Sequence, residues 1–353
     1  MMEMSTSAAT GPSPRERALI AAARSGDENA YAALVEPHRR ELRAHCYRML
    51  GSVHDADDAV QDALLRAWRG LPRFEGRSTT RSWLYKITTN ACLNAIARRP
   101  KARVLPMDFG PSAEPHDGVG MPLVESVWVE PYPDADLPLA DTFAAPDARY
   151  DQRESVELAF VAALQHLPPN QRAVLIMREV LGFSARESAD ALDTTVASIN
   201  SALQRARKTI DDKLPERSQQ TTLRALGDDE VRRLVQRYVD AWARNDVDAV
   251  VAMLTDDATF SMPPNVSWFR GPAAIAAFLP TGPMSRPRRF RPVEANGQLA
   301  FGTYIWEPDL GRFRPNSIHL IDLRGDRIAA MTAFLDRAVF RHFGLPETLP
   351  ADA

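Results

Sequence analysis

The spacing of apolar residues changes along this chain from a helical period to a period of two, and this change constrains the fold most. Residues 18–99 and 153–213 carry apolar side chains three and four positions apart, which is typical of amphipathic helices. After residue 288 the apolar side chains alternate, with turn residues at Asn296-Gly297 and at 324–326. We therefore expect helical domains followed by an α+β domain with an antiparallel sheet.

Composition limits the class of protein and the compartment that we expect for this chain. The chain has 353 residues, and no apolar run approaches the roughly 20 residues that span a bilayer. Its polar N-terminus lacks the apolar segment of a secretory signal, so we expect a cytoplasmic protein with no membrane partner. Cys46 and Cys92 lie in helical patterns without metal-ligand spacing and are expected to be reduced core residues. We expect neither a metal nor a cofactor.

Residues 18–100 are expected to form a helical domain. One helical stretch ends at Gly51, a second opens at Asp55 and a third runs from Ser82 to about Arg98. The second reads DADDAVQDALLRAW, and its acids crowd into the N-terminal half, where the helix dipole favours negative charge. Its outer face can meet a basic, partly apolar groove of another protein. The alternative is an ordinary solvated helix face.

The segment EGRSTTRSWLYKITTN, residues 75–90, sets hydroxyls between two arginines and follows them with aromatic rings and a lysine. Hydroxyls and guanidinium groups contact phosphates, whereas aromatic faces stack on unpaired bases. The segment therefore indicates a surface for single-stranded nucleic acid. The alternative is a capped loop whose Trp83 lies in the core. The net charge of −3 gives no global signature of nucleic-acid binding, so such binding must come from local basic faces.

Residues 151–215 carry the pattern of a helix-turn-helix. Ser184 and Glu187 form a capping box that predicts a short helix, and Thr195 is expected to cap a second, basic helix. The preceding residues 101–150 are rich in Pro, Asp and Glu and are expected to be a mostly irregular linker. Apolar residues within it, such as Trp128 and Tyr132, predict that part of it docks on a neighbouring domain.

Together, the acidic helix, the segment FEGRSTTRSWLYKITTNACLNAIARR and the helix-turn-helix resemble the sigma-70 family of transcription initiation factors, specifically its extracytoplasmic-function (ECF) group. The C-terminal stretches YVDAWARNDVDAVVAMLTDDATFSMPP and WFRGPAAIAAFL resemble SnoaL-like domains of the nuclear-transport-factor-2 superfold. The resemblance implies a multidomain fold. Two all-α sigma domains, the region 2 helical bundle and the region 4 helix-turn-helix, precede an α+β, cone-shaped SnoaL-like domain.

The expected boundaries follow from these resemblances and from the composition. They are a disordered tail at 1–17, sigma region 2 at 18–100, the linker at 101–150, sigma region 4 at 151–215, a second linker at 216–227, the SnoaL-like domain at 228–345 and a tail at 346–353.

The resemblance also implies roles for individual residues. Core-polymerase binding is expected at Asp58, Gln61, Asp62 and Leu65. Melting of the promoter −10 element and capture of the non-template strand are expected at Arg77, Ser78, Thr79, Thr80, Arg81, Trp83, Tyr85, Lys86 and Asn90. Recognition of the −35 element is expected at Thr195, Ser198, Asn200, Ser201, Gln204, Arg205, Arg207 and Lys208. Candidate pocket residues of the SnoaL-like domain are Trp242, Phe260, Trp268, Tyr304, Trp306, His319 and Asp336.

The implied partners are core RNA polymerase, promoter DNA as duplex and melted strand, and a small-molecule ligand of the C-terminal domain. The leading hypothesis is a sigma factor regulated by that fused domain in place of a separate anti-sigma protein. No catalytic residue is assigned. One alternative is a SnoaL-type isomerase or cyclase-like enzyme, acting through Asp336 or His319, fused to a DNA-binding region. A conventional repressor or activator is a further alternative, although it would need neither the acidic helix nor the melting segment.

Overall fold

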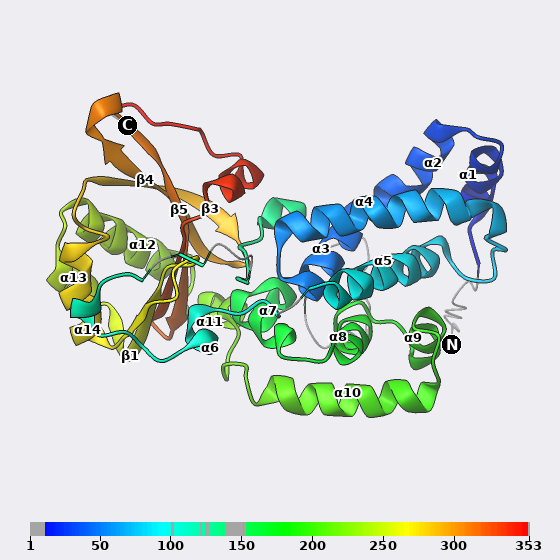
Figure 1. Ribbon diagram of the computed structural model, residues 1–353, viewed down its shortest axis with the longest axis horizontal. Helices are drawn as coiled ribbons and strands as arrows, with labels where there is room; N and C mark the ends of the chain where they lie inside the picture. Colours follow the sequence, from blue (N-terminus) through cyan, green and yellow to red (C-terminus); the bar gives the residue numbers. More distant parts are fainter. Residues whose placement is uncertain are drawn as a thin grey trace, which may run out of the picture.

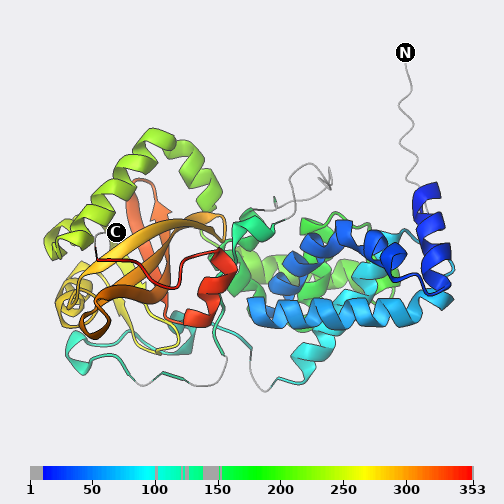
Figure 2. The ribbon, with the colours of Figure 1, turned by 90° about the horizontal axis from the view of Figure 1, so that it is seen from above.

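The structure is a computed structural model of the chain, and it describes residues 11–99, 102–120, 122–123, 127–137, 151 and 153–351. The first ten residues of the expected N-terminal tail, linker residues 138–150 and the last two residues lie outside this described part. Among the described helices, none has the length and apolar character that a membrane span needs. Figures 1 and 2 show two lobes side by side, one helical and one built around a sheet.

The N-terminal half of the helical lobe consists of α1 (Pro14–Arg24), α2 (Glu28–Val35), α3 (Arg39–Leu50), α4 (Val53–Gly70) and α5 (Thr80–Ala97). Helix α1 begins inside the segment expected as a tail because Ser13 and Glu16 form a reciprocal capping box. Helices α3, α4 and α5 pack on one another around apolar residues. Cys46 and Cys92 are both buried free thiols, with their Sγ atoms 3.5 Å apart.

The second half of this lobe consists of α7 (Leu158–Gln165), α8 (Pro169–Leu175), α9 (Ala185–Ala191) and α10 (Val196–Asp211), and α8 continues as a π-helical turn, Ile176–Val180. The capping box of Ser184 and Glu187 at α9 is confirmed, and so is the Thr195 cap of α10. Asp193 has a φ of 49° in the turn between these two helices. Ile199, Leu203, Ala206 and Ile210 form the buried stripe of α10, which leaves its polar residues outward.

The sheet lobe begins with α11 (Gln219–Leu226), which lies within the segment expected as a second linker. Ser218 caps α11 by accepting a hydrogen bond from the Thr221 amide. The remaining elements are α12 (Asp228–Ala243), α13 (Val247–Val251), β1 (Leu254–Ser261), β2 (Trp268–Arg270), α14 (Pro272–Phe278), β3 (Arg288–Ala295), β4 (Gln298–Glu307), β5 (Arg312–Arg324), β6 (Arg327–Phe334) and the 3-10 segment η9 (Arg337–Phe343).

The six described strands form one sheet in the order β2-β1-β6-β5-β4-β3. All neighbours are antiparallel except β1 and β6. The hairpin predicted at Asn296-Gly297 is confirmed, since Ala295 pairs with Gln298 and both turn residues have positive φ. Beyond η9, Leu349 is buried and pairs with Phe313, so part of the expected C-terminal tail packs on the sheet.

The linker docks on the sheet lobe, although in sequence it lies between the two helical halves. Its short helix α6 (Pro106–Phe109) is followed by chain that runs beside β2. The Ala113 amide donates to the Trp268 carbonyl at 2.8 Å, and the Leu123 amide donates to the Pro264 carbonyl at 3.1 Å. Linker residues 127–129 and 132 are buried. Apolar contacts therefore run without interruption from α3 through the linker to β4 and β5.

Candidate functional site

The expected polymerase-binding residues lie along the outer face of α4. Asp58 and Gln61 are exposed, and Asp62 is half-exposed and forms an ion pair with Arg66 at 2.8 Å. Leu65 is 51% exposed and lies one turn beyond Gln61 and Asp62 on the same side of the helix. The buried stripe of α4 holds this face outward.

Segment 75–90 forms the loop before α5 and the first turns of that helix. Arg77 is exposed, whereas Ser78, Thr79, Arg81, Trp83, Lys86 and Asn90 are half-buried, and Thr80 and Tyr85 are buried. Trp83 stacks on Phe74 with ring centroids 4.6 Å apart. Trp83 also packs against two apolar clusters of the helical lobe and is half-buried, so the core interpretation describes at least part of its surface.

Several side chains of this segment already have partners inside the protein. Arg81 donates to a Glu41 carboxylate oxygen at 2.9 Å and lies over the rings of Tyr85 and Phe183. The Tyr85 hydroxyl donates to the same carboxylate, and burial raises its pKa well above the ordinary value. Lys86 forms an ion pair with Asp193 at 2.5 Å, and its ammonium also donates to the Asp190 carbonyl. Lys86 therefore joins α5 to the turn of the helix-turn-helix.

The residues on the outward face of α10 are more exposed than those of segment 75–90. All eight residues expected to meet duplex DNA are exposed: Thr195, Ser198, Asn200, Ser201, Gln204, Arg205, Arg207 and Lys208. Arg207 forms an ion pair with Glu179, and Arg205 donates to the Ser201 hydroxyl at 2.7 Å. The side chains thus present hydroxyl, amide and cationic groups along one helix, a chemistry that suits base edges and phosphates.

A cavity of about 420 Å³ opens in the sheet lobe, and we call it the cone cavity. Its described lining includes three of the seven candidate pocket residues: Trp242, Phe260 and His319. The other four lie elsewhere. Trp268 donates its indole NH to the Gly110 carbonyl, the Tyr304 hydroxyl donates to the Pro346 carbonyl, Trp306 packs on Phe313, and Asp336 lines a second pocket.

Three basic side chains line the cone cavity, namely Arg286, Arg288 and His319. Burial and the neighbouring Arg288 lower the pKa of His319 to about 3, so its imidazole is neutral at pH 7. His319 shares a hydrogen bond of 3.2 Å with the Tyr238 hydroxyl. Burial and Arg286 lower the pKa of Arg288 to about 10, which still leaves it charged. The described lining contains no Asp or Glu.

Sequence reasoning missed several polar residues of the cone cavity, among them Arg288, Thr303, Asn316 and Ser317. Strand alternation could have found two of them. Ser317 lies two positions from His319 on β5, so both side chains point to the same face, and Thr303 pairs with Ser317 across β4 and β5. Their hydroxyls are 2.6 Å apart.

Asn296 at the β3–β4 turn joins the two lobes. Its side-chain amide donates to the Tyr47 hydroxyl at 2.8 Å and to the Val156 carbonyl at 2.7 Å. Its side-chain oxygen accepts from the Tyr132 amide at 2.8 Å, and its own amide donates to the Tyr132 carbonyl. Since Asn296 is fully buried, one side chain ties α3, the linker and Val156, two residues before α7, to the sheet lobe. We call this set of contacts the Asn296 junction.

Glu130 of the linker holds the N-terminus of α4. Its carboxylate accepts from the Ser52 hydroxyl and the Val53 amide, each at 2.9 Å, and forms an ion pair with His54 at 3.1 Å. Burial opposes ionisation of Glu130, yet the His54 hydrogen bond and the charge of Arg103 lower its pKa below the ordinary value. The hydrogen bond to Glu130 correspondingly raises the pKa of His54. The linker thereby contacts the helix that carries the acidic face.

Comparison with known proteins gives three family matches along this chain. Residues 34–101 match Sigma-70 region 2, residues 157–210 match Sigma-70 region 4, and residues 235–331 match the SnoaL-like domain. The ECF RNA polymerase sigma factor SigG of Mycobacterium tuberculosis is 42% identical over 330 residues, which cover 92% of this chain and 86% of that protein. The ECF RNA polymerase sigma factor SigM of the same organism is 32% identical over 189 residues, or 54% of this chain and 79% of that protein.

A solved structure supports the fold. The crystal structure of the Mycobacterium tuberculosis extracytoplasmic function sigma factor SigJ superposes with a TM-score of 0.56 and 22% sequence identity. The match covers 87% of this chain and 97% of that chain, so both helical parts and the sheet lobe recur in the same order.

Proposed function

The chain belongs to the ECF RNA polymerase sigma factors and carries a fused C-terminal SnoaL-like domain, and from this membership we propose how its surfaces divide the work of initiation. The outer face of α4, with Asp58, Gln61, Asp62 and Leu65, binds core RNA polymerase. Segment 75–90 captures the melted non-template strand, and the outward face of α10 reads duplex DNA. The exposure of the α4 and α10 faces supports these roles.

We further propose that the compact arrangement of this chain is its resting state, and the ion pair between Lys86 and Asp193 carries the argument. The names −10 and −35 give the positions of the two promoter elements, which are about 25 base pairs apart. At 3.4 Å per base pair this separation is about 85 Å of duplex. Helix α10 has 16 residues and begins beside Asp193. At 1.5 Å per residue it reaches about 24 Å from that contact. The two surfaces must separate before both elements are bound.

The C-terminal domain is proposed to regulate this separation through the Asn296 junction. The buried Asn296 amide holds Tyr47 of α3 and Val156, two residues before α7, at the same time. Both helical halves are therefore fixed while the β3–β4 hairpin stays docked. A tethered domain acts at a high effective concentration, and a separate anti-sigma protein is then dispensable. A ligand in the cone cavity could favour release only by binding the two states with different affinity.

Distance measurement tests the resting-state proposal. Spin labels on Arg73→Cys and Asp212→Cys report the separation of the two helical halves, because both positions are exposed whereas the native Cys46 and Cys92 are buried. We expect one defined distance, that of the compact arrangement, in the free protein and an increase of several tens of ångströms in a transcribing promoter complex. An unchanged distance in a complex that makes transcript would refute the proposal.

The catalytic alternative has less support from the cavity. A general base works best with a pKa near the working pH, and the pKa of about 3 leaves His319 a weak base. Asp336 lies in a different pocket. We therefore expect His319→Gln and Asp336→Asn to change promoter output little in a protein that stays folded. Loss of output in both variants, with polymerase binding intact, would favour the enzyme hypothesis instead.

A further inference from the structure

The cone cavity holds a cation that no carboxylate of the described lining neutralises. Arg288 of β3 lines this cavity, and its pKa of about 10 leaves it charged at pH 7. Its Nε donates to the Pro283 carbonyl, and among the described residues the two terminal guanidinium nitrogens have no hydrogen-bond or ion-pair partner. The other arginine of the lining, Arg286, forms an ion pair with Glu307 at 3.8 Å. Arg288 is therefore an unpaired cation in the wall of a cavity.

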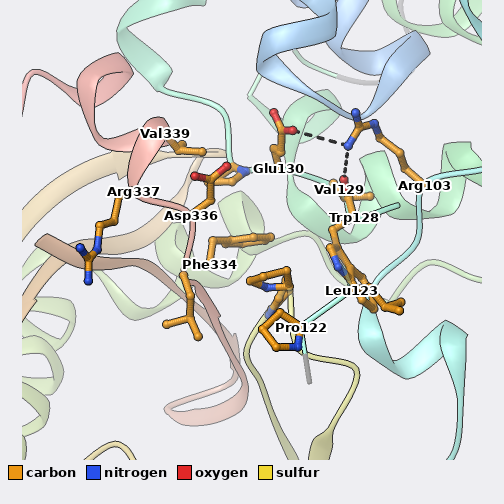
Figure 3. A pocket seen from close by; sticks show the side chains of 14 residues that line it. Arg103, Pro122, Leu123, Trp128, Val129, Glu130, Phe334, Asp336, Arg337 and Val339 are labelled. Carbon is orange, nitrogen blue, oxygen red and sulfur yellow. Dashed lines mark hydrogen bonds and ion pairs between the residues drawn. The ribbon is translucent and has the colours of Figure 1, made fainter. Parts of the chain in front are cut away.

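A second cavity, of about 500 Å³, lies between the linker and the sheet lobe and differs in how its charge is balanced (Figure 3). Arg103 there donates to the Trp128 carbonyl at 2.7 Å and to a Glu130 carboxylate oxygen at 3.5 Å. Arg103 thus has acceptors inside the protein. For the terminal nitrogens of Arg288 the described residues supply none, so an acceptor must come from solvent or from a ligand.

The side chains around Arg288 are apolar and accessible. Arg288 and Phe290 lie two positions apart on β3, so they point to the same face of the sheet, and both are partly exposed. The guanidinium carbon of Arg288 and the Phe290 ring lie 6.0 and 5.6 Å from the centre of the Trp242 ring. Leu335 is partly exposed, and Val119 of the linker is 39% exposed. All of these residues line the cone cavity, so one small molecule can contact both the charge and the apolar surface.

A carboxylate suits the free edge of Arg288. A guanidinium binds a carboxylate through two parallel N–H···O bonds, and such charge-assisted bonds are about twice as strong as neutral ones. One carboxylate carries one negative charge, which matches one unpaired guanidinium. A phosphate monoester would bring close to two charges into a cavity with apolar walls, where an unbalanced charge is costly. The volume of about 420 Å³ is typical of a small-molecule site.

We propose that the cone cavity binds a small monocarboxylic acid with an aromatic body, as in an arylacetate. The carboxylate pairs with the terminal nitrogens of Arg288, and the ring packs on Phe290 and on Val119 of the linker. The next linker residue, Gly120, donates its amide to the Ser267 hydroxyl at 3.1 Å, so the linker lies against the sheet lobe at this site. A bound acid therefore stabilises the docked linker. The effect of the acid on transcription rests on the proposed regulatory function, whereas its binding does not.

Titration calorimetry on the full chain with 2-naphthylacetate tests the proposal, and 2-naphthylacetamide is the neutral probe of similar shape. We expect saturable one-to-one binding of the acid and at least about tenfold weaker binding of the amide. Arg288→Gln should weaken acid binding at least about tenfold and leave amide binding unchanged, which also shows that the variant is folded. Arg289→Gln is the matched control and should bind both probes as the wild type does, because Arg289 lies over Phe313 outside the cavity.

Three calorimetric outcomes would overturn the proposal: no saturable binding of the acid, equal affinity of acid and amide for the wild-type protein, or equal losses in Arg288→Gln and Arg289→Gln. A measurement on the unaltered protein covers the case of an unstable variant. Nuclear Overhauser effects should join the naphthyl protons to the methyl groups of Val119 and Leu335 at saturating acid, and their absence would refute the location. Neither experiment contains polymerase or DNA, so a failure here leaves the resting-state proposal standing, and an unchanged spin-label distance leaves the acid site standing.

Discussion

The two proposed DNA-facing surfaces of this protein differ in how far they are already occupied. The outward residues of α10 are all exposed. In segment 75–90, Arg81, Tyr85 and Lys86 have internal partners at Glu41, Phe183 and Asp193. The first surface can meet a duplex as it stands, whereas the second must exchange protein contacts for nucleic-acid contacts. Control of this sigma factor is therefore expected to act on strand capture rather than on duplex binding.

Disruption of the Asn296 junction should give the largest difference in effect between the two DNA-facing surfaces. Asn296→Asp removes two buried donors and places a negative charge against the Val156 carbonyl, so we expect a loss of about 3 kcal/mol of unfolding free energy. Amide hydrogen exchange in segment 75–90 should accelerate, while salt-dependent duplex binding should be retained. Asp326→Ala, at the exposed β5–β6 turn, is the matched control and should be neutral. Unchanged exchange in Asn296→Asp would contradict the junction's role.

The attachment of the helical lobe should also depend on pH. Glu157 accepts from the Gln219 and Gln220 amides of α11, and burial raises its pKa from 4.5 to about 7, with Asp322 and Glu154 adding to the shift. The folded protein therefore holds the proton more tightly than the unfolded chain. Its contribution to stability is complete below pH 4.5 and is lost as pH rises to about 7.

We expect this loss to reach about 2 kcal/mol between pH 5 and pH 7.5. Denaturant unfolding at several pH values should show it, and Glu157→Gln should reduce the slope over that range without abolishing it, because burial also raises the pKa of Asp322 to about 7 and that of Asp134 to about 6. An equal pH slope in the wild-type protein and in Glu157→Gln would exclude this carboxyl as the cause.

The duplex surface has its own test. Arg205→Ala together with Lys208→Ala should weaken duplex binding about tenfold and lower the salt slope by roughly 0.9 for each phosphate that is no longer neutralised. Permanganate reactivity on a pre-melted template should be spared, because segment 75–90 is unchanged. Arg207→Ala should have a smaller effect on the slope, since Arg207 is paired with Glu179. Equal weakening on duplex and pre-melted templates would show that the two surfaces do not divide the work.

The smallest effect is expected for the ion pair between Lys86 and Asp193, which directly joins the two surfaces. A double-mutant cycle on Lys86→Ala and Asp193→Ala should give a coupling of about 0.5 kcal/mol, because the ion pair is largely exposed to solvent. High salt should abolish it. A coupling above about 2 kcal/mol would mean that this ion pair, rather than the Asn296 junction, closes the compact state.

Local chemistry allowed much of the fold to be predicted. The caps at Ser184 and Thr195 and the hairpin at Asn296-Gly297 depend on residues within a few positions of one another, and all three are confirmed. The tail and the second linker were predicted less well. The Ser13 capping box extends the fold toward the N-terminus, and α11 is stabilised by Glu157, which lies 62 residues away from Gln219.

The candidate sites show the same difference between features set by nearby residues and features set by residues far apart in the sequence. Helical period alone places the α4 and α10 residues outward, as the structure has them. The cone cavity gathers side chains from separate strands, and of the seven candidate pocket residues Trp242, Phe260 and His319 line it. Asn296 was identified as a turn residue, but its partners Tyr47 and Val156 are distant in sequence. No local pattern encodes such a pairing.

The distance in sequence between Asn296 and Tyr47 has a consequence for synthesis of the chain. Their hydrogen bond joins residues 249 positions apart. At about 5 to 20 residues per second, a ribosome needs on the order of 12 to 50 s to make the second partner after the first. Both helical halves leave the ribosome within this interval, before the hairpin that joins them exists. Each newly made molecule therefore passes once through an open form, and the junction forms only late in translation.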